Sequence, residues 1–137
     1  LRAQGLAYVR FATQTPELYR IATMGEWCSG NIIDMTLDSS VFKHLRSTVQ
    51  KLMDQGFYLP DDPTVVALEF WSAAHGVASM LIAKPHLPFG DADAFADRVL
   101  CSVLCGRAVI GYCGPNATPS NLAAWLSARR PSRESRI

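Results

Sequence analysis

The stretch from Pro63 to Ala83 constrains the fold of this chain more than any other segment. It reads PTVVALEFWSAAHGVASMLIA and carries a single charged side chain, Glu69. Asp62 suits an N-cap, and Pro63 suits the first helical turn, where its missing N–H would lack an intrahelical partner in any case. The sequence therefore predicts a helix over residues 63–83.

Apolar side chains cover two faces of this predicted helix. At helical spacing one stripe consists of Leu68, Trp71, His75, Ala78 and Ile82, and the other of Val66, Phe70, Ala73, Val77 and Met80. A helix that is apolar on two faces needs neighbours on both, and in so short a chain one neighbour can be a second subunit. Polar and small residues interrupt the run and Lys84-Pro85 ends it, so we do not expect it to span a membrane.

The composition favours one globular domain with a single sizeable core. The chain has 137 residues, of which 49% are hydrophobic and 18% charged. A formal net charge of +1 gives no basic surface of the kind that binding nucleic acid through phosphates requires. The four cysteines follow no signal peptide, and Cys101 and Cys105 are one helical turn apart. They are predicted to be buried thiols in a reducing, cytoplasmic compartment.

Two helices are predicted at the start of the chain. Over residues 1–13, Leu6, Val9, Ala12 and Thr13 share a face that Tyr8 and Phe11 widen, and this helix ends near Gln14. The next helix restarts at Thr15-Pro16-Glu17, and its inward residues are predicted to be Leu18, Ile21, Ala22 and Gly25. Because the chain enters directly into a helical pattern at Leu1, we expect that residues upstream of it are missing.

Three further helical segments are predicted. Residues 31–37 have no clean helical period and are interpreted as a loop or a short helical turn. The following segment, which ends at Gly56, is clearly amphipathic and is predicted to be a helix. Its apolar side chains are Phe42, Leu45, Val49, Leu52 and Met53. After a loop rich in proline, Asp91 can cap a long apolar helix from Ala92 to about Tyr112. Thr118-Pro119 can begin a short segment with Leu122, Trp125 and Leu126, and residues 129–137 are predicted to be a mobile, arginine-rich tail.

No strand pattern and no internal repeat is present, so the predicted fold class is all-α, with five or six helices. The segment GLAYVRFATQTPELYRI at Gly5–Ile21, followed by Trp71, His75 and Gly76 in W-x-x-x-H-G spacing, resembles the C-terminal domain of tetracycline-repressor-like (TetR family) regulators. The resemblance covers Leu1 to about Tyr112 and is to the subclass named for its Trp, His and Gly.

This resemblance implies a ligand-sensing and dimerisation domain of a transcription regulator. The regulator is expected to be a repressor that a small apolar effector releases from DNA. The domain spans residues 1–113, with residues 114–137 as a tail that holds a possible short helix. In that family the last two long helices form a four-helix bundle across the dimer, and an N-terminal helix-turn-helix domain binds the operator. Operator DNA would be bound only through such an N-terminal domain, which this sequence lacks.

Two groups of site residues are predicted. An apolar effector pocket is expected to be lined by Tyr8, Phe11, Met24, Trp27, Phe42, Leu45, Trp71 and His75. The homodimer interface is expected to contain Val77, Leu81, Val99, Val103, Leu104 and Ile110. For His75 the favoured interpretation is a structural histidine whose hydrogen bonds are satisfied at a helix contact. Gly76 is predicted to permit a close approach between helices.

No chemistry of catalysis or metal binding is predicted. Cys101, Cys105 and Cys113 lack C-x-x-C spacing and a nearby histidine, and the aspartates are explained as residues at helix starts. We therefore expect no enzyme, no cofactor and no metal site. An alternative function is a small-molecule-binding or scaffold helical dimer that does not bind DNA, because the charge is nearly neutral.

Overall fold

The computed structural model describes residues 1–24, 39–114 and 118–129 of the chain. Within these ranges it contains helices and no strands, which confirms the all-α prediction. The helices are α1 (Arg2–Gln14), α2 (Pro16–Met24), α4 (Ser40–Asp54), α5 (Pro63–Ala83), α6 (Ala92–Cys113) and α7 (Pro119–Ser127). The predicted loop at 31–37 and, except for Arg129, the predicted tail at 129–137 lie outside the described residues.

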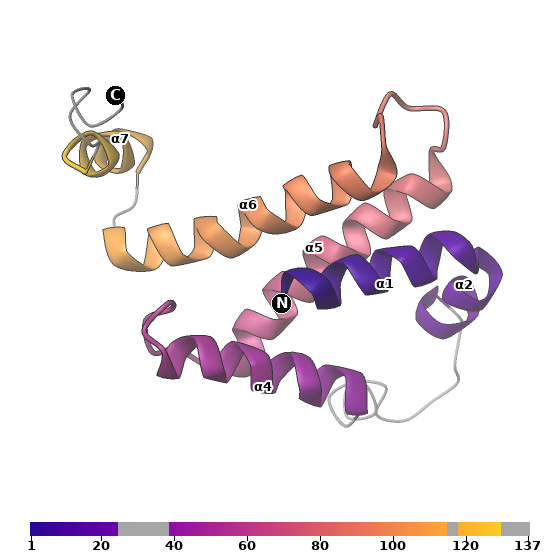
Figure 1. Ribbon diagram of the computed structural model, residues 1–137, viewed down its shortest axis with the longest axis horizontal. Coiled ribbons are helices and arrows are strands. Elements are labelled where there is room, and N and C mark those ends of the chain that lie inside the picture. Colours follow the sequence, from indigo (N-terminus) through magenta and orange to yellow (C-terminus); the bar gives the residue numbers. More distant parts are fainter. Residues whose placement is uncertain (25–38, 115–117, 130–137) are drawn as a thin grey trace, which may run out of the picture.

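Helix α5 is the centre of the fold. Helices α1, α4 and α6 all pack against it, and α1 also packs against α6. Figure 1 shows α5 running diagonally, with the other three helices along its length. Its bounds match the prediction, and the Asp62 carboxylate caps it by accepting the Thr64 backbone N–H at 2.8 Å. By length and composition α5 is the one helix among the described residues that qualifies as a membrane span. Its packing is that of a core helix.

Helix α4 follows its predicted pattern. Phe42, Leu45, Val49 and Met53 are buried against α5, and Ser39 caps the helix by accepting the Phe42 N–H at 3.2 Å. Beyond the helix, Gly56 has a φ of +75°, a backbone conformation that favours glycine and supports its predicted role as a stop.

The predicted inward face of α2 is wrong. Leu18 is 53% exposed, Ile21 is 57% exposed, and Ala22 is exposed, whereas Tyr19 is fully buried. The helix starts directly after α1, and the junction turns it so that the hydroxyl-bearing aromatic residue faces α5. Gly25 lies outside the described residues.

In α1 the buried residues are Gly5, Val9 and Ala12. Phe11 is 41% exposed and Thr13 is exposed, so these two residues do not extend the buried face of α1.

Helix α6 has little of its surface buried. Ala96 and Leu100 are its buried residues, and Ile110 and Tyr112 remain 50% and 48% exposed. Two ion pairs fasten it to α1: Arg2 binds Asp97 through both carboxylate oxygens, and Arg10 binds Asp93 at 2.9 Å. The excess of apolar surface predicted for α6 is therefore visible as exposed side chains.

Helix α7 begins as predicted, with the Thr118 hydroxyl accepting the Asn121 N–H at 3.2 Å. It contacts the body of the protein through α6 and contains no buried residue. The guanidinium of Arg129 lies 4.0 Å from the centre of the Trp125 ring, which is the geometry of a cation–π contact. The short segment with Leu122, Trp125 and Leu126 is thus a helix on the surface.

A glycine does permit a close helix contact, but it is Gly5 and not Gly76. A Cβ on Gly5 would lie 2.8 Å from Leu100 Cδ1 and 3.0 Å from Phe70 Cε1, so α1 approaches α5 and α6 closely only without a side chain here. A Cβ on Gly76 would meet nothing within 4 Å. The prediction for Gly76 is wrong because Gly76 itself lies on the exposed side of α5, although Ala74 and Val77 next to it are buried.

Gly5→Ala and Gly76→Ala form a matched pair that tests this contact. Overpacking at Gly5 costs roughly 1–3 kcal/mol, of which the better helix propensity of Ala returns up to about 1 kcal/mol, so we expect a net loss of stability. Gly76→Ala should stabilise the protein by up to about 1 kcal/mol. Chemical denaturation of both variants measures these changes; equal effects of the two substitutions would contradict the assignment.

Candidate functional site

A hydrogen-bond network surrounds His75 on α5. The hydroxyl of Tyr19, from α2, lies 2.7 Å from His75 Nδ1, and the hydroxyl of Tyr8, from α1, lies 3.2 Å from the same nitrogen. Tyr19 also reaches the Ser79 hydroxyl at 3.2 Å, one turn further along α5. Which atom donates depends on the histidine tautomer. The network joins three helices at one imidazole ring.

Aromatic rings extend this network into an assembly that we name the His75 cluster. Its members are Tyr8, Tyr19, Phe42, Trp71 and His75. Ring centres are 5.9 Å apart for Tyr8 and Tyr19, 6.2 Å for Trp71 and His75, and 6.4 Å for Phe42 and Trp71. These spacings lie within the range of favourable aromatic contacts. Burial raises the pKa of Tyr8 well above its ordinary value, so this phenol stays neutral and able to donate.

The structure brings together half of the predicted effector residues. Tyr8, Phe42, Trp71 and His75 meet in the His75 cluster, and Leu45 is buried beside Phe42 in the same core. Phe11 instead lies exposed on α1. Met24 ends α2 without a described side chain, and Trp27 lies outside the described residues. His75 is hydrogen-bonded at a helix contact, as the structural interpretation requires; its contact with a ligand stays a prediction.

Tyr19 is the member of the cluster that the sequence interpretation missed. A buried tyrosine requires a hydrogen-bond partner for its hydroxyl, and His75 is one of the few polar residues in the middle of the apolar central helix. The shared requirement of Tyr19 and His75 for a hydrogen-bond partner is the signal from which their contact could have been predicted.

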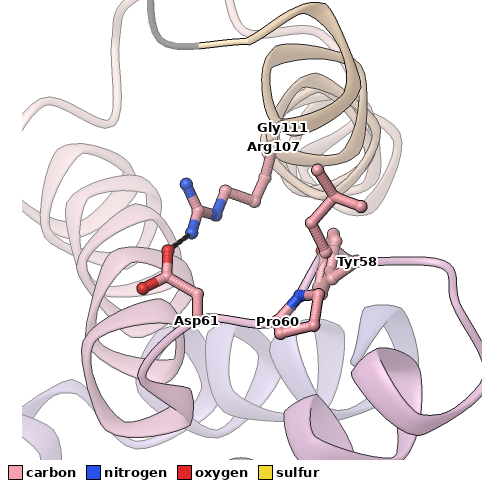
Figure 2. Close-up of a pocket in the computed structure, with 6 residues that line it drawn as sticks. Tyr58, Pro60, Asp61, Arg107 and Gly111 are labelled. Atoms are coloured by element: carbon pink, nitrogen blue, oxygen red, sulfur yellow. Dashed lines mark hydrogen bonds and ion pairs between the residues drawn. The ribbon is translucent and has the colours of Figure 1, made fainter.

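A second feature is a cavity of about 200 Å³ between the α4–α5 connection and α6, which we name the Arg107 cavity. It is lined by Tyr58, Leu59, Pro60, Asp61, Arg107 and Gly111 (Figure 2). The Arg107 guanidinium forms ion pairs with Asp61 and with Glu69, the latter at 3.4 Å. The backbone N–H of Asp62 and the Arg107 guanidinium hold the pKa of Asp61 below its usual value. Asp61 is thus part of a tertiary ion pair as well as a residue before a helix.

The residues predicted for a dimer interface divide by burial. Val77 is 5% exposed and packs inside the chain's own core, so we leave it out of any interface. Leu81, Val99, Val103 and Leu104 are half-buried at the edges of that core, and Ile110 is 50% exposed. Of the six predicted interface residues, Ile110 in the C-terminal half of α6 is therefore the most exposed.

The prediction of buried thiols is wrong for the cysteines of α6. Cys105 is exposed, and Cys101 and Cys113 are partly exposed, because α6 buries only a narrow strip of its surface. Cys28 lies outside the described residues. Among the residues that the structure describes, no group of three or more His, Cys, Asp or Glu side chains is placed to hold a metal ion.

Comparison with known families matches this architecture to a described domain. The sequence model of the tetracyclin repressor-like C-terminal domain matches residues 1–103. The match covers most of the chain, including all of α1, α4 and α5, and the chain belongs to this family. Neither a curated protein nor a solved structure matches the chain significantly. The domain is therefore of the kind that TetR-type transcription regulators use for ligand binding and dimerisation.

Tyr19→Phe tests whether the network holds α2 against α5. The substitution leaves the ring in place but removes the hydroxyl that bonds His75 and Ser79. We expect a loss of about 1–3 kcal/mol in the free energy of unfolding, because buried polar groups lose a partner. Tyr112→Phe, which removes a hydroxyl from a half-exposed residue that bonds the Gly56 carbonyl, is the control and should cost less. Urea denaturation compares the two; a smaller loss at Tyr19 would contradict this assignment.

Proposed function

We propose that this chain is the effector-binding and dimerisation domain of a TetR-like repressor of the Trp-His-Gly subclass, acting in the cytoplasm. The observation that carries the proposal is the family match over residues 1–103. The order of Trp71, His75 and Gly76 on the central helix supports the subclass. Contact with operator DNA belongs to a separate helix-turn-helix domain of the regulator.

The effector site in this proposal is the His75 cluster together with the residues predicted around it. Aromatic walls and a few oriented polar groups are typical of sites for small apolar molecules. Phe42 and Trp71 offer ring surfaces, while Tyr8, Tyr19 and His75 offer hydrogen bonds that can orient a ligand. The effector is therefore proposed to be a small apolar molecule with one polar group.

The same cluster can couple the binding of a ligand to the relative positions of the helices. Tyr8 lies on α1, Tyr19 on α2 and His75 on α5, so a ligand that takes over one of these hydrogen bonds changes how two helices are held together. A ligand shifts such an equilibrium only by its difference in affinity for the two arrangements. In this proposal the effector favours the arrangement that releases operator DNA.

The substitution Trp71→Ala tests whether Trp71 is a wall of the effector site or only fills the core. Truncating a fully packed tryptophan costs roughly 3–5 kcal/mol, but Trp71 is half-buried, and as a pocket wall it should cost less. We expect a modest loss of stability with a loss of at least tenfold in affinity for the effector. Native mass spectrometry of the purified regulator identifies the bound molecule, and thermal unfolding with ligand titration of the variant follows. A large stability loss with unchanged affinity would argue against this site.

The proposed dimer uses the exposed apolar surface of α6 together with α5. Leu81, Val99, Val103, Leu104 and Ile110 are the remaining interface candidates. Ile110 is half exposed although it is large and apolar, and α6 buries few of its residues within the chain. An obligate interface would bury about 2,000 Å² or more in total.

Ile110→Glu tests this interface with little risk to the fold, because the side chain is half exposed. A charge placed in an apolar seam should shift the protein from dimer to monomer at micromolar concentration. Ser102→Glu, on an exposed position of the same helix, is the control and should remain dimeric. Analytical ultracentrifugation gives the masses; a monomeric wild-type domain would rule out the proposed dimer.

The near-neutral charge favours one alternative, a helical dimer that binds a small molecule without acting on DNA. A gel-shift assay distinguishes the two functions. Residues 1–137 alone should bind no operator, because they lack a basic surface that neutralises phosphates. The full-length protein should bind operator DNA under the proposed function and fail to bind it under the alternative.

A further inference from the structure

The Arg107 cavity differs in chemistry from the His75 cluster and lies on other parts of the fold. One side is apolar, formed by Leu59, Pro60 and the ring of Tyr58; the other is polar, formed by Asp61 and Arg107. Figure 2 shows Asp61 and Arg107 joined by their ion pair, with Pro60 and Tyr58 facing them across the cavity. The backbone of Gly111 leaves space in the wall on the α6 side.

The ion-pair group at the polar side carries an excess of negative charge, although one of its members, Glu69, does not itself line the cavity. Arg107 is paired with Asp61 and with Glu69, so two carboxylates surround one guanidinium. All three side chains are partly exposed, with 26% of the Arg107 side chain accessible. A carboxylate ligand would add a third negative charge to this group, whereas an ammonium ion would balance the charge.

We propose that the Arg107 cavity binds a small primary amine, with its ammonium group beside Asp61 and its apolar body against Leu59 and Pro60. At about 200 Å³ the cavity is smaller than the usual range for drug-sized ligands, so the amine has only a few carbon atoms or one ring. Such a ligand bridges the α4–α5 connection and α6. This site is independent of the effector site proposed above, and either can fail alone.

Three ring compounds of similar size that differ in charge provide the test. Benzylamine is the probe, and benzyl alcohol and benzoate are the neutral and anionic comparators. Titrations of the ¹⁵N-labelled protein by NMR should show saturable binding of benzylamine in the millimolar range, with the largest shifts at the amides of Leu59, Asp61 and Gly111. The affinity should fall in the order benzylamine, benzyl alcohol, benzoate.

Two substitutions and a control locate the binding. Gly111→Leu fills the cavity, since a Cβ there would make an ordinary contact of 4.0 Å with Leu59, and should abolish the shifts. Gly106→Leu is the control on the same helix, where a Cβ meets nothing within 4 Å, and should leave binding unchanged. Glu69→Gln removes the charge excess without filling the cavity and should weaken benzylamine binding at least threefold.

The outcome with Glu69→Gln decides the matter even if Gly111→Leu fails to fold. Weaker benzylamine binding in that variant, together with the expected order of the three probes, supports an amine site. The proposal is overturned if benzylamine gives no saturable shifts, if benzoate binds as tightly as benzylamine, or if neither substitution changes binding.

Discussion

The close contact of α1 with α5 and α6 is the constraint on which the rest of this fold depends. Because Gly5 has no side chain, Phe70 and Leu100 lie directly against the α1 backbone. This contact fixes the position of α1, and with it the position of Tyr8 one turn later on the same helix, next to His75. The polar network at the centre of the molecule thus depends on a packing contact that contains no polar group.

The helices follow from local sequence signals, whereas their partners do not. Asp62-Pro63 and Ser39 start α5 and α4 at the expected residues, since capping acts over a few neighbouring positions. Gly5 and Gly76 have similar local surroundings in the sequence, yet only Gly5 faces two other helices. That difference is tertiary, and a single sequence does not contain it.

In the candidate site too, contacts within one helix were predicted from the sequence and some contacts between helices were missed. Trp71 and His75 were predicted to share a face because spacing within one helix is fixed. Tyr19 was missed because its bond to His75 joins residues 56 positions apart, and because apolar spacing alone favoured Leu18 and its neighbours for the buried face. The ion pairs of Arg107 were missed for a related reason: they join α6 to a connection whose path depends on how α4 and α5 pack.

The position of α1 has a consequence for how the chain acquires its structure. Its ion pairs reach Asp93 and Asp97, which are 83 and 95 residues later in the sequence. Contacts of such separation form slowly, because a long loop must close before they contribute. During synthesis the first two helices therefore emerge long before the surfaces that bury Val9 and Tyr19 exist. Until α5 and α6 leave the ribosome, this pair of helices exposes apolar side chains that a chaperone can bind.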